Sequence, residues 1–211
     1  MTELVFILDR SGSMCGLEQD TIGGFNSMLK KQSSEPGDAF VSTVLFDDRA
    51  EVIHDRIPIA DVPMLTEKDY CVRGCTALLD AVGAAIRHIG NIHKYARKED
   101  VPEKTLFIIT TDGMENASCR YSYAEVSRLI KNQKEKYGWE FLFLGANIDA
   151  VKEAARFGID ESRTANYHCD EYGTELNYAV LSETISMVRK GKESLPADWK
   201  KKIDEDYQKR R

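Results

Sequence analysis

The chain has 211 residues, 42% hydrophobic and 30% charged, a composition typical of a globular protein and not of a disordered or fibrous one. Its length suits one α/β domain, and its net charge of −6 argues against a nucleic-acid-binding surface, which would need a basic patch. No apolar segment approaches the roughly 20 residues that span a bilayer, and the N-terminus lacks a secretory signal pattern. We therefore expect a cytoplasmic protein with no membrane or nucleic-acid partner.

The first predicted element is a buried strand. Five consecutive apolar residues at positions 4–8 are typical of a strand covered on both faces in a parallel sheet. The run ends at Asp9, and Ser11 and Ser13 follow. Ligands of open α/β sheets bind at the carboxyl ends of the strands, so a site is expected here. One carboxylate with two hydroxyls is a hard oxygen set that suits Mg²⁺ or Mn²⁺.

The next elements alternate between helix and strand. Apolar residues at mostly helical spacing predict a helix over 17–31, which the segment 34–37, with its proline and glycine, ends. Two β-rich runs, 39–46 and 51–54, flank a short polar link and predict a hairpin, so one of these strands should run antiparallel to the others. An irregular polar connection over 57–73 follows.

The second half of the chain continues the alternation. A long amphipathic helix is predicted over 76–96, and a second buried strand over 105–111 ends at Asp112. The remaining predictions are helices over 122–137, 150–157 and 174–188, with strands over 140–145 and 163–169. This order predicts an α/β fold with a doubly wound, mostly parallel sheet. We expect one domain over 1–190 and a charged C-terminal tail over 191–211, where residues 189–211 carry nine Lys/Arg and five Asp/Glu.

The segment Asp9-Arg10-Ser11-Gly12-Ser13, placed after a first apolar strand, resembles the opening of the metal-ion-dependent adhesion site (MIDAS) of von Willebrand factor A (vWA) domains. That family's site draws on three loops, and the chain supplies the other two in order with Thr76 and Asp112, which complete the motif. The resemblance extends over about residues 3–188. It implies a Rossmann-like vWA fold with one antiparallel edge strand.

The resemblance also implies a ligand set and a function. The hydroxyls of Ser11, Ser13 and Thr76 would ligate Mg²⁺ or Mn²⁺, and Asp9 and Asp112 would do so directly or through water. In the family, the open metal position accepts a Glu or Asp carboxylate of a partner protein. The implied function is a divalent-metal-dependent protein-binding module without catalytic activity. Because Gly74 and the irregular segment precede Thr76, we expect its loop to move and to couple the metal to partner binding.

The alternative is an enzyme, a Mg²⁺-dependent hydrolase or phosphotransferase using the Asp9 and Asp112 edge. Haloacid-dehalogenase-type phosphotransferases need a second aspartate where this chain has Ser11, and a serine nucleophile needs a positioned base. The four histidines are assigned to surface positions of strands and helices, and no P-loop motif is present. The binding module is therefore the favoured interpretation.

The five cysteines, an odd number without a secretory signal, are expected to be reduced. They lie near the predicted site loops, at Cys15, Cys71, Cys75, Cys119 and Cys169. They could form a thiolate metal site or a redox switch. The favoured interpretation is that they are buried and pack the loops as small hydrophobic side chains.

Overall fold

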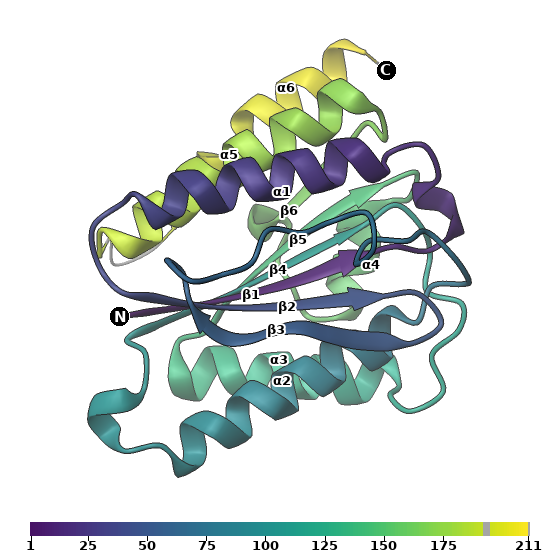
Figure 1. Ribbon diagram of the computed structural model, residues 1–211. Coiled ribbons are helices and arrows are strands. Elements are labelled where there is room, and N and C mark those ends of the chain that lie inside the picture. The colour runs from purple at the N-terminus through teal and green to yellow at the C-terminus, as the bar shows by residue number, and fades with distance from the viewer. Residues whose placement is uncertain (192–194, 211) are drawn as a thin grey trace.

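The computed structural model describes residues 1–191 and 195–210, and a six-stranded sheet lies at its centre, between helices on both faces (Figure 1). The strands are β1 (Thr2–Asp9), β2 (Ala39–Phe46), β3 (Ala50–Pro58), β4 (Lys104–Thr111), β5 (Glu140–Ala146) and β6 (Thr164–Tyr167). Their order is β3-β2-β1-β4-β5-β6, and all neighbouring pairs are parallel except β2 with β3. The predicted mostly parallel sheet with one antiparallel edge strand is confirmed.

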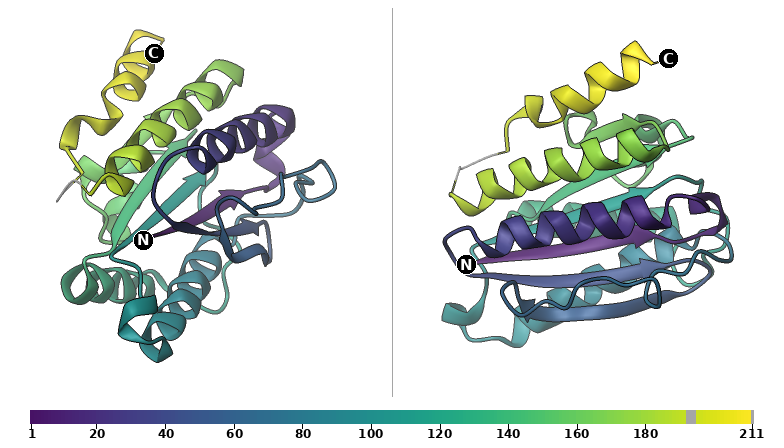
Figure 2. Two further views of the ribbon diagram at one scale, coloured as in Figure 1. Left: turned by 60° about the vertical axis from the view of Figure 1, so that its left-hand side comes forward. Right: turned by 45° about the horizontal axis from the view of Figure 1, so that its top comes forward.

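Helices cover both faces of the sheet. The helices are α1 (Glu18–Ser33), α2 (Leu78–Tyr95), α3 (Tyr123–Tyr137), α4 (Ala150–Arg156), α5 (Glu171–Arg189) and α6 (Lys201–Lys209). One face carries α1 and α5 side by side, and the other carries α2 and α3, as Figures 1 and 2 show. Short 3₁₀ turns occupy Gly12–Met14, Lys98–Asp100, Glu161–Arg163 and Ala197–Lys200. The two-sided covering is that of a doubly wound α/β fold.

The core consists of two apolar layers, one on each side of the sheet. Side chains alternate along β1, so Phe6 packs toward α1 and contacts Phe25 edge to face, with ring centroids 5.2 Å apart. Val5 and Ile7 point to the opposite layer, under α2 and α3. Residues 4–8 are at most 1% exposed. The central strand is therefore held rigidly at both faces, which fixes the position of Asp9 at its end.

Near the sheet edge, the structure places two element boundaries at other residues than the sequence predicted. Helix α2 begins at Leu78 and not at position 76, because the Asp80 N–H donates to Ser118 Oγ at 3.0 Å and not to the Thr76 carbonyl, which accepts from Asn116 N–H at 3.0 Å. Thr76 N–H donates to Asn116 Oδ1 at 2.9 Å, and Ala77 N–H donates to the Asp47 carbonyl at 2.7 Å. The last strand, predicted over 163–169, covers only Thr164–Tyr167 because a 3₁₀ turn precedes it.

Residues 195–210 pack on the domain; the tail predicted over 191–211 also includes residues 192–194 and 211, which lie outside the described residues. Leu195, Trp199 and Ile203 are buried in the layer that contains α5. The Trp199 indole N–H donates to the Ser162 carbonyl at 2.8 Å, and Lys200 Nζ donates to the Thr164 carbonyl of edge strand β6 at 2.6 Å. Apolar residues four apart give this segment a buried stripe that the surrounding lysines conceal in the sequence. None of the helices in the two described ranges has the length and apolarity to cross a membrane.

Candidate metal centre

Three loops meet at the edge of the sheet where β1, β2 and β4 end. Because these strands are parallel, their carboxyl ends lie together, and the loops after β1 and β4 share one surface. The loop that carries Thr76 precedes α2, and the Ala77 N–H attaches it to the Asp47 carbonyl just after β2. Asp9, Ser11, Thr76 and Asp112 are buried there, whereas Ser13 is exposed. The predicted residues are thus gathered at one edge, with Ser13 on its open side.

Direct contacts join the first and third loops. Ser13 Oγ donates to Asp112 Oδ1 at 2.5 Å, and the hydroxyls of Ser11 and Ser13 lie 3.1 Å apart. The second loop reaches the same place, as Gly113 shows: a Cβ built on this glycine would lie 3.3 Å from Ser13 Oγ and 3.3 Å from Thr76 Oγ1. The missing side chain leaves a small space that hydroxyls from two loops surround.

Burial disfavours ionisation of the two carboxyl groups. Burial raises the pKa of Asp9 to about 6, although hydrogen bonds from Ser11 and Thr111 act in the opposite direction, and the nearby Asp112 carboxylate raises it further. Burial also raises the pKa of Asp112, despite hydrogen bonds from Ser13 and Cys169. Two such carboxyl groups at one edge are an environment that a bound cation would stabilise.

Sequence reasoning missed the residues that orient these ligands. Thr111 Oγ1 donates to Asp9 Oδ2 at 2.6 Å, while Ser11 N–H donates to Asp9 Oδ1 at 2.7 Å. Cys169 Sγ lies 3.5 Å from Asp112 Oδ2 and donates to it. The sequence does contain a signal for Thr111, because it is a polar residue at the end of a strand, one residue before Asp112. Its pairing with Asp9 depends on the register of β1 against β4, which the sequence does not display.

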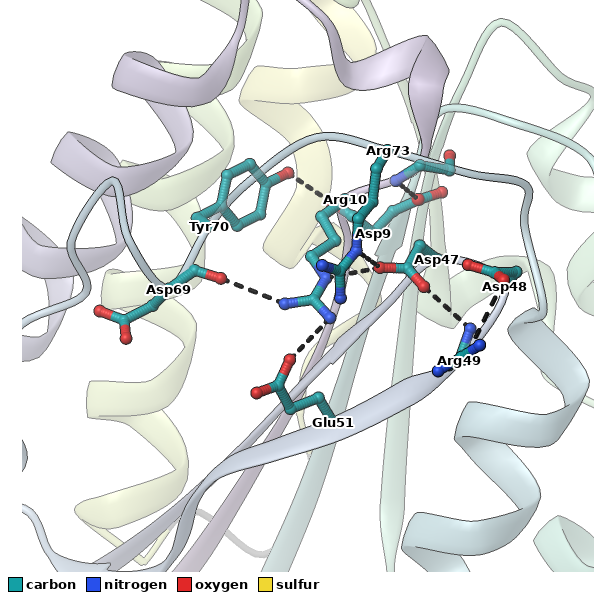
Figure 3. A network of polar contacts seen from close by, with 10 residues as sticks. Asp9, Arg10, Asp47, Asp48, Arg49, Glu51, Asp69, Tyr70 and Arg73 are labelled. Atoms are coloured by element: carbon teal, nitrogen blue, oxygen red, sulfur yellow. Dashed lines mark hydrogen bonds and ion pairs between the residues drawn. The ribbon is translucent and has the colours of Figure 1, made fainter.

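A buried ionic network lies beside the candidate centre (Figure 3). Arg10, which is 2% exposed, donates to Asp47 Oδ2 at 2.8 Å and to Glu51 Oε2 at 2.8 Å. Arg73 donates to the same Asp47 oxygen at 2.9 Å. Burial by itself would raise the pKa of Asp47, but hydrogen bonds from Arg73, the Arg49 backbone and Arg10 prevail and lower it to about 2. Asp47 is therefore a charged anchor shared by two arginines.

The network and nearby backbone bonds fasten the segment before Thr76, which the sequence suggested was free to move. Arg73 N–H donates to the Arg10 carbonyl at 2.9 Å, and Gly12 N–H donates to the Gly74 carbonyl at 3.2 Å. The buried Tyr70 hydroxyl donates to the carbonyl of Asp9. The segment is irregular, as predicted, but it is attached to the first loop at several points.

Four of the five cysteines do not pack the loops. Cys15, Cys71, Cys75 and Cys119 are exposed, so the expectation of buried thiols is wrong for them, whereas Cys169 is half-buried and packs against the core. These residues lie in loops at the sheet edge, where the backbone turns outward. Across residues 1–191 and 195–210, the structure contains no group of three or more His, Cys, Asp or Glu residues arranged to hold a metal ion. The candidate centre is not such a group, because three of its five proposed ligands are hydroxyls and only two are carboxyl groups.

Known structures share this fold. A comparison with protein-family models finds no match, and neither does a comparison with curated protein sequences. Among solved structures, the von Willebrand factor domain of the type V pili tip protein Mfa5 from Porphyromonas gingivalis matches with a TM-score of 0.63 at 11% identity, over 89% of this chain and 96% of that one. A von Willebrand factor type A protein from Catenulispora acidiphila matches with a TM-score of 0.58 at 14% identity, over 87% of this chain and 42% of that one.

A third match is proximal thread matrix protein 1 from the mussel byssus, solved with a zinc-occupied MIDAS motif, with a TM-score of 0.56 at 18% identity. It covers 86% of this chain and 45% of that one. The chain therefore spans less than half the length of two of these three structures. At these identities the likeness establishes the fold, which is that of von Willebrand factor A domains.

The comparisons also correct the predicted cytoplasmic location. The structures that share the fold include the pili tip protein, a minor pilin from Streptococcus sanguinis and a pilus adhesin from Lactobacillus rhamnosus. Pili are surface-displayed, so this fold occurs in proteins outside the cytoplasm. The prediction rested on the missing signal pattern, which says nothing of where such a fold operates.

Proposed function

We propose that the chain is a divalent-metal-dependent protein-binding module, in which Asp9, Ser11, Ser13, Thr76 and Asp112 hold Mg²⁺ or Mn²⁺. The observation that carries the proposal is the convergence of two buried carboxyl groups and three hydroxyls from three loops. The fold likeness to a protein with a metal-occupied MIDAS motif supports it.

The residues present fit such an ion. All five side chains offer oxygen, the donor that Mg²⁺ and Mn²⁺ prefer, and three of them are neutral. The space over Gly113, between Ser13 Oγ and Thr76 Oγ1, would be filled by any larger residue at that position. The raised pKa values of Asp9 and Asp112 indicate carboxyl groups that lack a compensating charge.

Each side chain has a distinct part in this function. When bound, the ion would supply a positive centre that attracts a partner's carboxylate, since the protein contributes only two negative charges. Thr111 and the Ser11 N–H hold both oxygens of Asp9 in place, and the rigid β1 strand prevents it from shifting. Ser13 is exposed and would lie nearest the partner. We propose a partner protein that presents a Glu or Asp side chain to this edge.

A capture experiment tests this proposal. The protein, immobilised in Mg²⁺, should retain a partner from a lysate of its source and release it in EDTA. Asp112→Ala should abolish retention, and Asp48→Ala should not, because Asp48 is an exposed carboxylate at the same edge outside the proposed ligand set. Replacing the partner's acidic residues one at a time should identify a single essential carboxylate. Retention that is equal in EDTA, or that survives Asp112→Ala, would contradict the proposal.

The enzymatic alternative lacks a histidine base in the described part of the chain. The histidines there hydrogen-bond to Thr43, Asp55, Glu3 and the Tyr207 carbonyl, and not to Ser11 or Ser13. The group that accepts from Ser13 is the carboxyl of Asp112, which the proposed metal ion would occupy as a ligand. We expect no turnover of generic phosphate or acyl esters in Mg²⁺. Turnover that Asp9→Ala removes would favour the enzyme.

Thr76→Ala should separate metal binding from partner binding. We expect metal affinity to fall by less than about threefold, because water can replace one neutral hydroxyl while both carboxylates remain. Partner affinity should fall about tenfold or more, equivalent to about 1.4 kcal/mol, if the loop that carries Thr76 adjusts when a carboxylate enters. Calorimetric titration with Mg²⁺, followed by partner titration at saturating Mg²⁺, measures both. Equal losses would show that Thr76 is an ordinary ligand and that its loop does not couple the two events.

A further inference from the structure

A cavity of about 620 Å³ lies between α2 and α3, away from the candidate metal centre. The two helices lie side by side under the sheet (Figure 1), and the cavity is lined mainly by their carboxyl-terminal halves. Because α2 begins beside Thr76 and runs back along the sheet, the cavity is at the edge opposite the metal centre. Small-molecule sites in proteins span roughly 300–1,000 Å³, so its size fits such a ligand.

Positive charge dominates the lining. Arg87, Lys94 and Arg128 line the cavity, and none of the lining residues that the structure describes is Asp or Glu. This is unusual in a chain with a net charge of −6. Lys94 is in the last turn of α2, where the helix dipole favours a cation, but Arg87 and Arg128 are in helix interiors and have no such explanation. A concave surface with positive groups and no carboxylates concentrates anions.

One polar group in the wall has no partner. Gln133 is 9% exposed, and its Oε1 is buried without a hydrogen bond in the described part of the chain. A buried amide oxygen costs about 1–3 kcal/mol when it is left unsatisfied, so such a group in a cavity wall points to a donor from outside. Gly90 gives the other end of this amide its room, since a Cβ at position 90 would lie 3.2 Å from Gln133 Nε2.

An aromatic surface completes the cavity. Trp139 lines it and is held in place, because its ring stacks on Phe107 with centroids 5.2 Å apart. Behind this wall, the Glu3 carboxylate contacts His93 Nε2 at 3.2 Å and is already paired with Arg56 at 2.8 Å. Glu125, outside the lining, lies near enough to Arg87 and Arg128 for both to lower its pKa, so one carboxylate offsets part of the charge of three basic side chains. Trp139 is only 4% exposed, whereas the ring of Tyr137, which also lines the cavity, is 65% exposed and offers a surface on which a planar ligand can pack.

We propose that this cavity binds a small organic anion with a planar ring. Its phosphate or carboxylate would pair with Arg87 and Arg128, which can form two parallel hydrogen bonds to either group. Its ring would pack on Tyr137, near Trp139, and an N–H or O–H group would donate to Gln133 Oε1. The site is independent of the metal centre, and neither proposal depends on the other.

Fluorescence titration tests the proposal on the full chain. The chain has two tryptophans, so Trp199→Phe leaves Trp139 as the reporter, and thermal melting checks that this variant is folded. The probes are AMP for the phosphate, indole-3-acetate for the carboxylate, adenosine as the neutral ring, and inorganic phosphate as the anion without a ring; binding of indole-3-acetate is followed by calorimetry, because its own indole fluorescence masks that of Trp139. We expect saturable binding of AMP or indole-3-acetate with a Kd below about 1 mM, and at least tenfold weaker binding of adenosine and inorganic phosphate. The tighter of the first two probes identifies the anionic group.

Variants locate the site. Arg87→Gln and Arg128→Gln should each weaken binding of the tighter probe at least tenfold, and Gly90→Leu should do so by filling the cavity without removing charge. Lys131→Gln is the matched control, because Lys131 lies on the same helix as Arg128, is exposed, and pairs with Glu135 outside the cavity. It should change the Kd by less than twofold. Failure of both anions to bind, equal binding of adenosine and AMP, or an equal effect of Lys131→Gln would overturn the proposal.

Discussion

Asp112→Ala is expected to remove most of the stabilisation that Mg²⁺ gives to this protein. A ligand that binds only the native state stabilises it by RT ln(1 + [L]/Kd), about 2.7 kcal/mol at a hundredfold excess over Kd. For a chain of this size, that corresponds to a rise in Tm of about 5–10 °C. Melting curves of EDTA-stripped protein, recorded with and without millimolar Mg²⁺ or Mn²⁺, measure the effect. Asp9→Ala should give the same loss, because both proposed ligands carry the negative charge.

The matched control for this experiment is again Asp48→Ala, which removes a carboxylate from the same sheet edge. Its metal-dependent rise in Tm should equal that of the unaltered protein, because Asp48 is exposed and contacts none of the proposed ligands in the described structure. If Asp48→Ala reduced the metal-dependent rise in Tm as much as Asp112→Ala does, the cations would be held by the general negative charge of this edge and not at a specific site. If metal leaves the melting of stripped protein unchanged, the proposed centre is wrong.

Asp47→Asn is expected to lower the free energy of unfolding by about 3–5 kcal/mol, because it breaks a buried ion pair and leaves a charge without its partner. Arg10 would remain 2% exposed, with only the half-exposed Glu51 as a charged partner. Urea unfolding in EDTA at pH 7 measures this loss without a contribution from metal. Such a loss would show that the fold of the sheet edge that carries the proposed ligands depends on the buried network in Figure 3.

Glu51→Gln is the matched control, since it removes a second carboxylate from the same arginine with the same chemical change. Glu51 is 56% exposed at its side chain, so its pair should contribute less than about 1 kcal/mol. Equal losses for the two variants would contradict the assignment of Asp47 as the anchor.

Acid should reduce the difference in stability between the unaltered protein and Asp47→Asn. The pKa of Asp47 is lowered to about 2 in the folded state, below its ordinary value of 3.8. A carboxyl group with a depressed pKa contributes stability above its unfolded pKa and loses it as the pH falls through the folded value. The stability difference should be constant above about pH 5 and shrink between pH 4 and pH 2. A difference that is unchanged at pH 2 would show that the ionised carboxylate is not its source.

The sequence by itself determined the central strand and the candidate ligands. Residues 4–8 are apolar without interruption, which is typical of a strand buried on both faces, and the structure buries each of them. The carboxyl ends of parallel strands share an edge, so Asp9 and Asp112 were predictable as neighbours from two strand ends alone. The ligand roles of these residues remain a prediction that the metal experiments test.

The tertiary structure alone decided which side chains orient those ligands and what the C-terminal segment does. The pairing of Thr111 with Asp9, and of Arg10 with Asp47, depends on strand register and on contacts between residues 37 to 102 positions apart. Local propensity carries no information on such contacts, because they form only when distant segments pack. Likewise Trp199 and Ile203 look like isolated apolar residues in a charged segment until β6 and α5 provide a surface for them to cover. A hydrophobic pattern shows which side chains need burial, and only the assembled sheet and helices determine where that burial is available.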